Sequence, residues 1–122
     1  MNGDPLAARR EEYATKLEEA VKRIREKLSR RPEVELVVLF GSYARGACDL
    51  LTDLDVLVVM RSEKPFVERV AQLYRELDVG VDMDLVCYTP EEFERMKERP
   101  FVKRALAEGV VLYEKKPSGR GP

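Results

Sequence analysis

Two aspartates separated by one residue, Asp53 and Asp55, are the strongest chemical feature of this sequence. They begin an apolar run, Leu54–Met60, that is typical of a buried strand. Side chains two residues apart in a strand point to the same face, so the two carboxylates should stand side by side. Such carboxylates repel each other unless a cation lies between them. Because oxygen ligands favour Mg²⁺ or Mn²⁺ over zinc, the pair predicts a divalent metal site.

A second feature is the pair Gly41-Ser42, which directly follows another apolar run, Val34–Phe40. Glycine lets backbone N–H groups approach an anion closely, and the Ser42 hydroxyl adds a further donor, so this turn is suited to phosphate oxygens. Arg45 is a candidate phosphate clamp, because a guanidinium group can bind phosphate with two hydrogen bonds. The segment is not a Walker P-loop, since no Lys-Ser or Lys-Thr pair follows it.

The composition excludes several other chemistries. The chain has no histidine, which removes histidine bases, histidine-bearing zinc sites and Ser-His-Asp triads. Cys48 and Cys87 lack CxxC spacing and are interpreted as reduced residues of a cytoplasmic protein. The charged first residues do not resemble a signal peptide, and no apolar run approaches the roughly 20 residues of a membrane span. A net charge of −1 argues against a general nucleic-acid or membrane-surface protein.

The elements that must position these residues alternate between helix and strand. An amphipathic helix should begin after the cap Asp4 and end before Pro32, and a capping box at Thr89 should begin a later helix that Pro100 interrupts. We expect Gly41–Leu51 to be a loop. The other expected elements are strands at 34–40, 54–60, 81–88 and 110–113, and helices at 62–78 and 101–108.

This order predicts an α/β (α+β) fold in which helices pack on a mixed β-sheet. The 122 residues suit one domain, which we place at residues 1–114. The remaining residues, 115–122, are rich in Lys, Gly and Pro and are expected to form a disordered tail.

The spacing of the two motifs carries a family resemblance. Ser42 is followed by ten residues and then by Asp-x-Asp, and Ser42 itself lies within Gly-Ser-x-Ala-Arg-Gly. This pattern resembles the minimal branch of the DNA polymerase β-type nucleotidyltransferase superfamily, over about Val34 to Tyr113. The resemblance implies a metal-dependent transfer of a nucleoside monophosphate from a nucleoside triphosphate to an acceptor. It also implies that Asp53 and Asp55 hold two Mg²⁺ ions on the triphosphate, while Gly41 and Ser42 hold its β- and γ-phosphates.

The family pattern includes a third carboxylate on a later strand. Asp84 matches it best, because the pattern places this aspartate before a short apolar strand end, as in Val81–Tyr88. Asp82 has the same facing parity and is the rival. By resemblance, the third carboxylate would bind the catalytic metal and help to deprotonate the acceptor hydroxyl.

Members of the minimal branch resemble antitoxins that pair with a helical HEPN-type toxin. This resemblance implies AMP transfer from ATP to a hydroxyl of such a partner, most consistently a tyrosine. The alternative is a non-catalytic antitoxin that acts by binding alone, although such a protein would not need three clustered carboxylates. A nucleic-acid acceptor is disfavoured by the near-zero net charge. Because nothing obvious in the chain covers the base, we also expect a homo-oligomer or a heterocomplex, with contacts made partly by exposed apolar residues of a helix.

Overall fold

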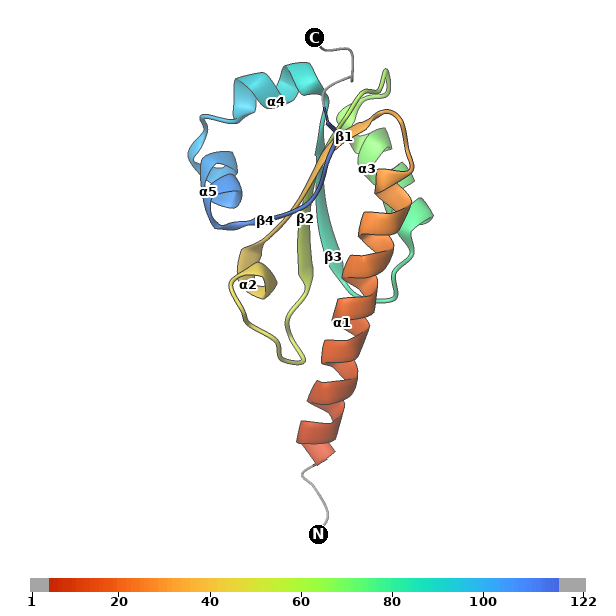
Figure 1. Cartoon of the computed structure of the whole chain (residues 1–122), viewed down its shortest axis with the longest axis vertical. Helices are drawn as coiled ribbons and strands as arrows, with labels where there is room; N and C mark the ends of the chain where they lie inside the picture. Colours follow the sequence, from red (N-terminus) through yellow and green to blue (C-terminus); the bar gives the residue numbers. More distant parts are fainter. Residues whose placement is uncertain (1–4, 117–122) are drawn as a thin grey trace.

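The computed structural model describes residues 5–116, so the expected Asp4 cap and all of the expected tail beyond residue 116 lie outside it. The described elements follow the expected order, with one addition (Figure 1). They are α1 (Pro5–Ser29), β1 (Val34–Phe40), α2 (Gly41–Ala44), β2 (Leu54–Met60), α3 (Phe66–Leu77), β3 (Met83–Tyr88), α4 (Pro90–Met96), α5 (Pro100–Glu108) and β4 (Val110–Glu114).

Two local expectations were wrong. The segment expected to be a loop from Gly41 begins with the short helix α2, which closes with a hydrogen bond from the Arg45 N–H to the Gly41 carbonyl at 3.2 Å. Strand β3 begins at Met83 rather than Val81, because Gly80, with φ 78°, turns the chain just before it. The expected capping box of α4 is confirmed at Thr89.

The strands form one mixed sheet in the order β3-β2-β1-β4. Strand β1 is antiparallel to both β2 and β4, whereas β2 and β3 are parallel. The register pairs Phe40 with Asp55 and Asp55 with Asp84. The end of β1 therefore lies beside the beginnings of β2 and β3, which is where the sequence motifs occur.

Helices cover the two faces of the sheet unequally (Figure 1). Helices α1 and α3 pack on one face over the larger core, which includes Leu17, Ile24, Val56, Val58, Leu73 and Leu77. Helices α4 and α5 pack on the other face over a smaller core of Val38, Phe40, Leu57, Val59, Val102 and Ala105. Because side chains alternate along a strand, Asp55 shares the second face with Leu57. The thinner cover leaves Asp55 half-buried and Asp84 exposed.

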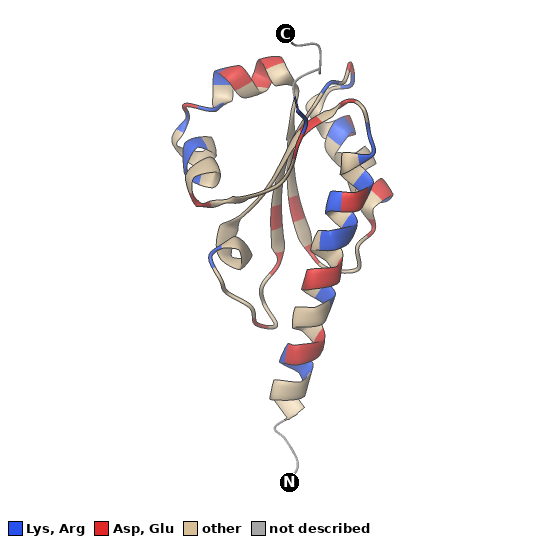
Figure 2. Ribbon diagram, viewed as in Figure 1, with Lys and Arg blue, Asp and Glu red and all other residues tan. Residues whose placement is uncertain are grey.

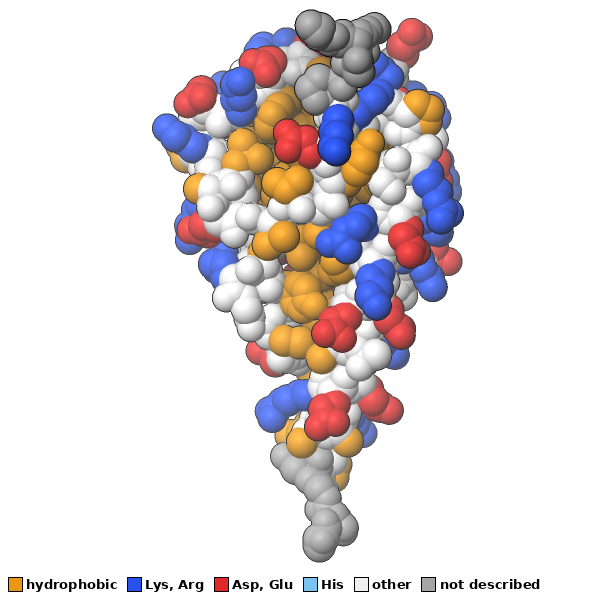
Figure 3. Space-filling view, viewed as in Figure 1, with side chains coloured by type: hydrophobic (Ala, Val, Ile, Leu, Met, Phe, Trp, Pro, Cys, Tyr) orange, Lys and Arg blue, Asp and Glu red, His pale blue; other side chains and the backbone are white. Residues whose placement is uncertain are grey.

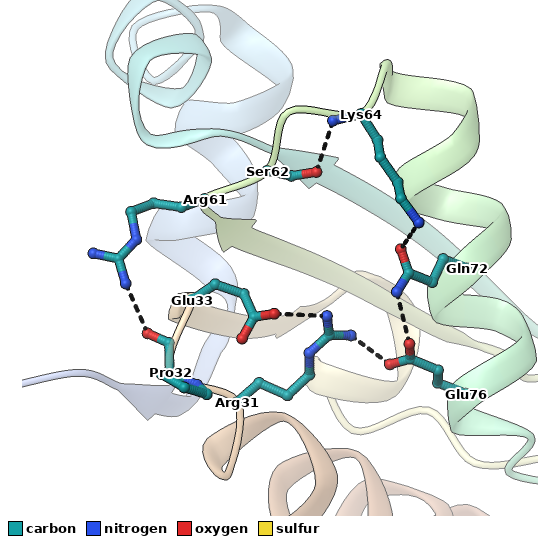
Figure 4. A network of polar contacts seen from close by, with 8 residues as sticks. All are labelled: Arg31, Pro32, Glu33, Arg61, Ser62, Lys64, Gln72 and Glu76. Carbon is teal, nitrogen blue, oxygen red and sulfur yellow. Dashed lines mark hydrogen bonds and ion pairs between the residues drawn. The ribbon is translucent and has the colours of Figure 1, made fainter.

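A polar network joins the end of α1 to α3 at the end of the sheet away from the aspartates (Figure 4). Arg31 forms ion pairs with Glu33, at 2.8 Å, and with Glu76. Gln72 connects Glu76 to Lys64 through hydrogen bonds of 2.9 Å each. Positive and negative side chains pair with one another here, so the network connects the segment after α1 to α3.

The surface beside α1 carries a strip of apolar side chains (Figure 3). On the edge strand β4, Val110 and Val111 are 47% and 53% exposed. None of the helices among residues 5–116 is both long enough and apolar enough to cross a membrane.

Candidate active site

Three carboxylates, two on the neighbouring strands β2 and β3 and one just before β2, converge on one face of the sheet. One oxygen each from Asp53, Asp55 and Asp84 lies within 4.8 Å of the others. Asp53 and Asp55 share a face because they are two residues apart, and the parallel register places Asp84 directly beside Asp55. Figure 2 shows the acidic positions of β2 and β3 as adjacent red segments. The register of the sheet thus brings together residues that are about thirty positions apart in the sequence.

Gly41 makes room for this cluster. Its φ of 78° lies in the left-handed region that favours glycine. A Cβ atom at this position would lie 2.0 Å from Oδ2 of Asp55, well inside any permitted contact. Glycine is therefore needed here for two reasons, its backbone angle and the close approach of the Asp55 carboxylate.

The cluster is electrostatically unfavourable when no cation is bound. Burial raises the pKa of Asp55 above its ordinary 3.8, and the negative charges of Asp53 and Asp84 raise it further. A hydrogen bond with Asp84 acts in the same direction, whereas the positive charge of Arg45 opposes the shift. A divalent cation would remove the repulsion among these groups.

The donor set fits a hard cation such as Mg²⁺ or Mn²⁺. Three carboxylates can each supply an oxygen, and among residues 5–116 they form the single group of three or more acidic or cysteine side chains with such spacing. Asp84 is exposed and Asp53 half-buried, so the group is open to a substrate from solvent. This arrangement can hold a metal and the phosphates of a nucleotide at the same place.

The phosphate-binding candidates lie next to the carboxylates. Ser42 is half-buried in α2, immediately after Gly41. Arg45 ends this helix, and its guanidinium group is close enough to lower the pKa of Asp55. Arg45 also forms an ion pair of 3.3 Å with Glu108 of α5. Glu108 was not identified from the sequence, because it is 63 residues away and belongs to no motif.

The structure separates the two candidates for the third carboxylate. Asp84 lies in the acidic group, while Asp82 is placed outside it. The Asp82 carbonyl accepts a hydrogen bond from the Leu54 N–H at 3.1 Å. Asp82 also lines a different pocket, of about 400 Å³, together with Tyr13 and Tyr74. The placement agrees with the choice of Asp84, whose catalytic role stays a prediction.

Comparisons with known proteins point to one family. The family model described as "Nucleotidyltransferase domain" matches residues 21–113. A candidate protein adenylyltransferase of Methanocaldococcus jannaschii is 32% identical over 83 residues, which cover 68% of this chain and 82% of the relative.

Solved structures share the fold. A candidate nucleotidyltransferase from Sulfolobus solfataricus superposes with a TM-score of 0.57 at 23% identity, covering 93% of this chain and 91% of that one. A toxin–antitoxin structure with AMP-PNP gives a TM-score of 0.52 at 24% identity, covering 79% of this chain and 74% of that one. At these identities the likeness concerns the fold alone, and it matches the expected mixed sheet with packed helices.

Proposed function

The chain belongs to the nucleotidyltransferase domain family, as its motifs predicted, and on that premise we propose that it transfers AMP from ATP to a hydroxyl group of a partner protein. The observation that carries this proposal is the convergence of Asp53, Asp55 and Asp84 beside Gly41. Adenylyl transfer to a protein is supported by the relative from M. jannaschii, which is named as a candidate for that activity.

Each residue of the site has a part in the proposed reaction. Gly41 and Ser42 bind the β- and γ-phosphates, and Arg45 neutralises their charge after exchanging its contact with Glu108. The acceptor oxygen attacks the α-phosphorus, the bond between the α-phosphorus and the bridging oxygen breaks, and pyrophosphate leaves. The acceptor proton passes to the Asp84 carboxylate. A divalent ion bound by the three aspartates supplies positive charge for the triphosphate and the entering oxygen.

A helical HEPN-type toxin is the partner that we propose, with this chain as its antitoxin. The sequence resemblance to the minimal branch supports this choice, and one structure that shares the fold is a toxin–antitoxin structure with AMP-PNP. A tyrosine is the proposed acceptor, since its hydroxyl, with a pKa of about 10, can be activated by a base and a metal. The exposed apolar residues of β4 offer a surface for such a partner or for a second copy.

Mass spectrometry of the partner tests this proposal. A helical HEPN-type protein, the proposed partner, is incubated with the chain, ATP and Mg²⁺, and it should gain the mass of one or more AMP groups. The double variant Asp53→Ala/Asp55→Ala should produce no adduct, whereas Asp82→Asn should still produce it. If the double variant inhibits the partner as well as wild type does, and the partner carries no adduct after incubation with either of them, the chain acts by binding alone.

A further inference from the structure

We infer that Tyr74 is a positioning residue for Asp84, an inference that rests on the proposed transfer reaction. The Tyr74 hydroxyl donates a hydrogen bond of 2.6 Å to the Met83 carbonyl and accepts one of 3.1 Å from the Leu85 N–H. These two backbone groups flank Asp84 on either side. One side-chain oxygen therefore fixes the backbone immediately before and immediately after the third carboxylate.

The position of β3 in the sheet explains why such a contact is needed. Strand β3 is an edge strand, so only its β2 side has a strand partner. Asp84 pairs with Asp55 on that side, while successive backbone groups along a strand point alternately in and out of the ladder. Met83 and Leu85 therefore direct their backbone groups outward. Tyr74, from α3, takes the place of the missing strand at this point.

The geometry matters because a shift of Asp84 changes its relation to Asp55. The Asp84 side chain is exposed, so neighbouring side chains cover little of it, and it shares a hydrogen bond with Asp55. Its placement must therefore come largely from its own backbone. A carboxylate that holds a metal and accepts the acceptor proton must keep its position within a fraction of an ångström, which groups beyond the ligands usually ensure.

The other strand of the site is fixed by several contacts rather than by one. The Thr52 carbonyl, just before Asp53, accepts a hydrogen bond of 2.7 Å from the Tyr13 hydroxyl. Thr52 also donates two hydrogen bonds to Asp49, one from its backbone N–H to the Asp49 carbonyl at 3.1 Å and one from its hydroxyl to the Asp49 carboxylate at 3.2 Å. Strand β2 in addition has partners on both sides. On the outer side of β3, the backbone around Asp84 is thus held by a single hydroxyl group, whereas several contacts hold the backbone before Asp53.

Replacing Tyr74 by Phe tests the inference, because the ring remains and only the hydroxyl is lost. At a saturating concentration of Mg²⁺, we expect kcat for adenylyl transfer to fall about tenfold, while KM for ATP stays within about twofold, since Asp84 acts on the acceptor side. The matched control is Tyr113→Phe on β4, the opposite edge strand, whose hydroxyl makes no hydrogen bond within residues 5–116. The control should retain the wild-type kcat. A Tyr74→Phe variant with wild-type kcat would overturn the inference.

A metal-binding measurement separates this inference from the proposed function. Titration of the protein with Mn²⁺, followed by electron paramagnetic resonance, needs no acceptor and no turnover. Tyr74→Phe should weaken Mn²⁺ binding about tenfold, and the Leu85 amide should exchange its hydrogen faster. If wild type binds Mn²⁺ and transfers nothing, the proposed function fails and this inference stands or falls on the titration. Equal Mn²⁺ affinity in the variant and wild type, or no affinity in either, would overturn it.

Discussion

Strand β3 has a charged cluster near each end, and the two clusters are built on opposite principles. Near the last residues of β3, the buried side chain of Arg69, which is 2% exposed, donates a hydrogen bond of 2.9 Å to the Cys87 carbonyl. Its guanidinium group also forms two hydrogen bonds, of 2.7 and 2.9 Å, with the Glu92 carboxylate. Near the beginning of β3, the charges that act on Asp55 are those of Asp53 and Asp84, which raise its pKa, and that of Arg45, which lowers it.

The difference shows how the molecule uses charge. Arg69 and Glu92 join α3 to α4 around the edge of the sheet, and Glu92 also completes the capping box of α4. Each group there has its partner within the chain, so the cluster stabilises the fold. In the aspartate cluster the positive charge of Arg45 opposes the effect of the negative groups only in part, and a bound cation would neutralise the rest. A cluster that costs stability in the free protein is explained by function rather than by folding.

The largest effect on stability should follow from removing the compensated arginine. Arg69→Met leaves the Glu92 carboxylate without its bidentate partner and should lower the free energy of unfolding by about 3 kcal/mol. Urea denaturation followed by circular dichroism measures this loss. The matched control is Lys97→Met, which removes the exposed Lys97–Glu94 pair of α4 and should change the stability little. A loss no larger than that of the control would mean that the buried pair contributes nothing special.

The two clusters should also respond to pH in opposite directions. Hydrogen bonds from Arg69 hold the pKa of Glu92 below its ordinary 4.5. The stability from this pair is therefore fully present above pH 4.5 and is lost as the pH falls through the lowered value. Denaturation of wild type across this range should show the loss, and Arg69→Met should show less of it. An unchanged pH dependence in the variant would contradict the assignment.

The smallest expected effect is a gain. Asp55→Asn removes one of two like charges that face each other across β2 and β3, and it should stabilise the metal-free protein by about 0.5 kcal/mol. Because the folded-state pKa of Asp55 is raised above 3.8, the gain should be present at neutral pH and disappear below that value. Urea denaturation in EDTA measures it. A loss of stability at pH 7 would show that the carboxylate serves the fold after all.

Local patterns in the sequence predicted most of the elements and part of the site. The β-branched runs identified the four strands, and the spacing of Gly41-Ser42 from Asp53 and Asp55 identified the two motifs. The choice between Asp82 and Asp84 rested on resemblance, because both have the same parity. Which of the two lies beside Asp55 depends on the register between β2 and β3, and no local pattern in the sequence determines that register.

Contacts between distant segments were beyond prediction for a similar reason. Arg69 and Glu92 are 23 residues apart, and nothing in the sequence pairs this arginine with that carboxylate. In the sequence, Tyr74 is indistinguishable from any other residue on the exposed side of a helix. Its hydroxyl finds a partner only because α3 passes the edge of β3 in the folded protein. Helix α2 was not predicted because Gly and Ser favour turns. The close approach of Gly41 to the Asp55 carboxylate was not predicted because it depends on the pairing of strands in the folded sheet.

The most direct test of the account follows the α-phosphate of ATP. Wild type with the proposed helical partner and Mg²⁺ should transfer label from ATP labelled at the α-phosphorus and none from ATP labelled at the γ-phosphorus. Asp84→Asn should abolish the transfer and Asp82→Asn should retain most of it, with both variants folded. Transfer of the γ-label, or a loss with Asp82→Asn that Asp84→Asn does not share, would contradict adenylyl transfer at the cluster of Asp53, Asp55 and Asp84.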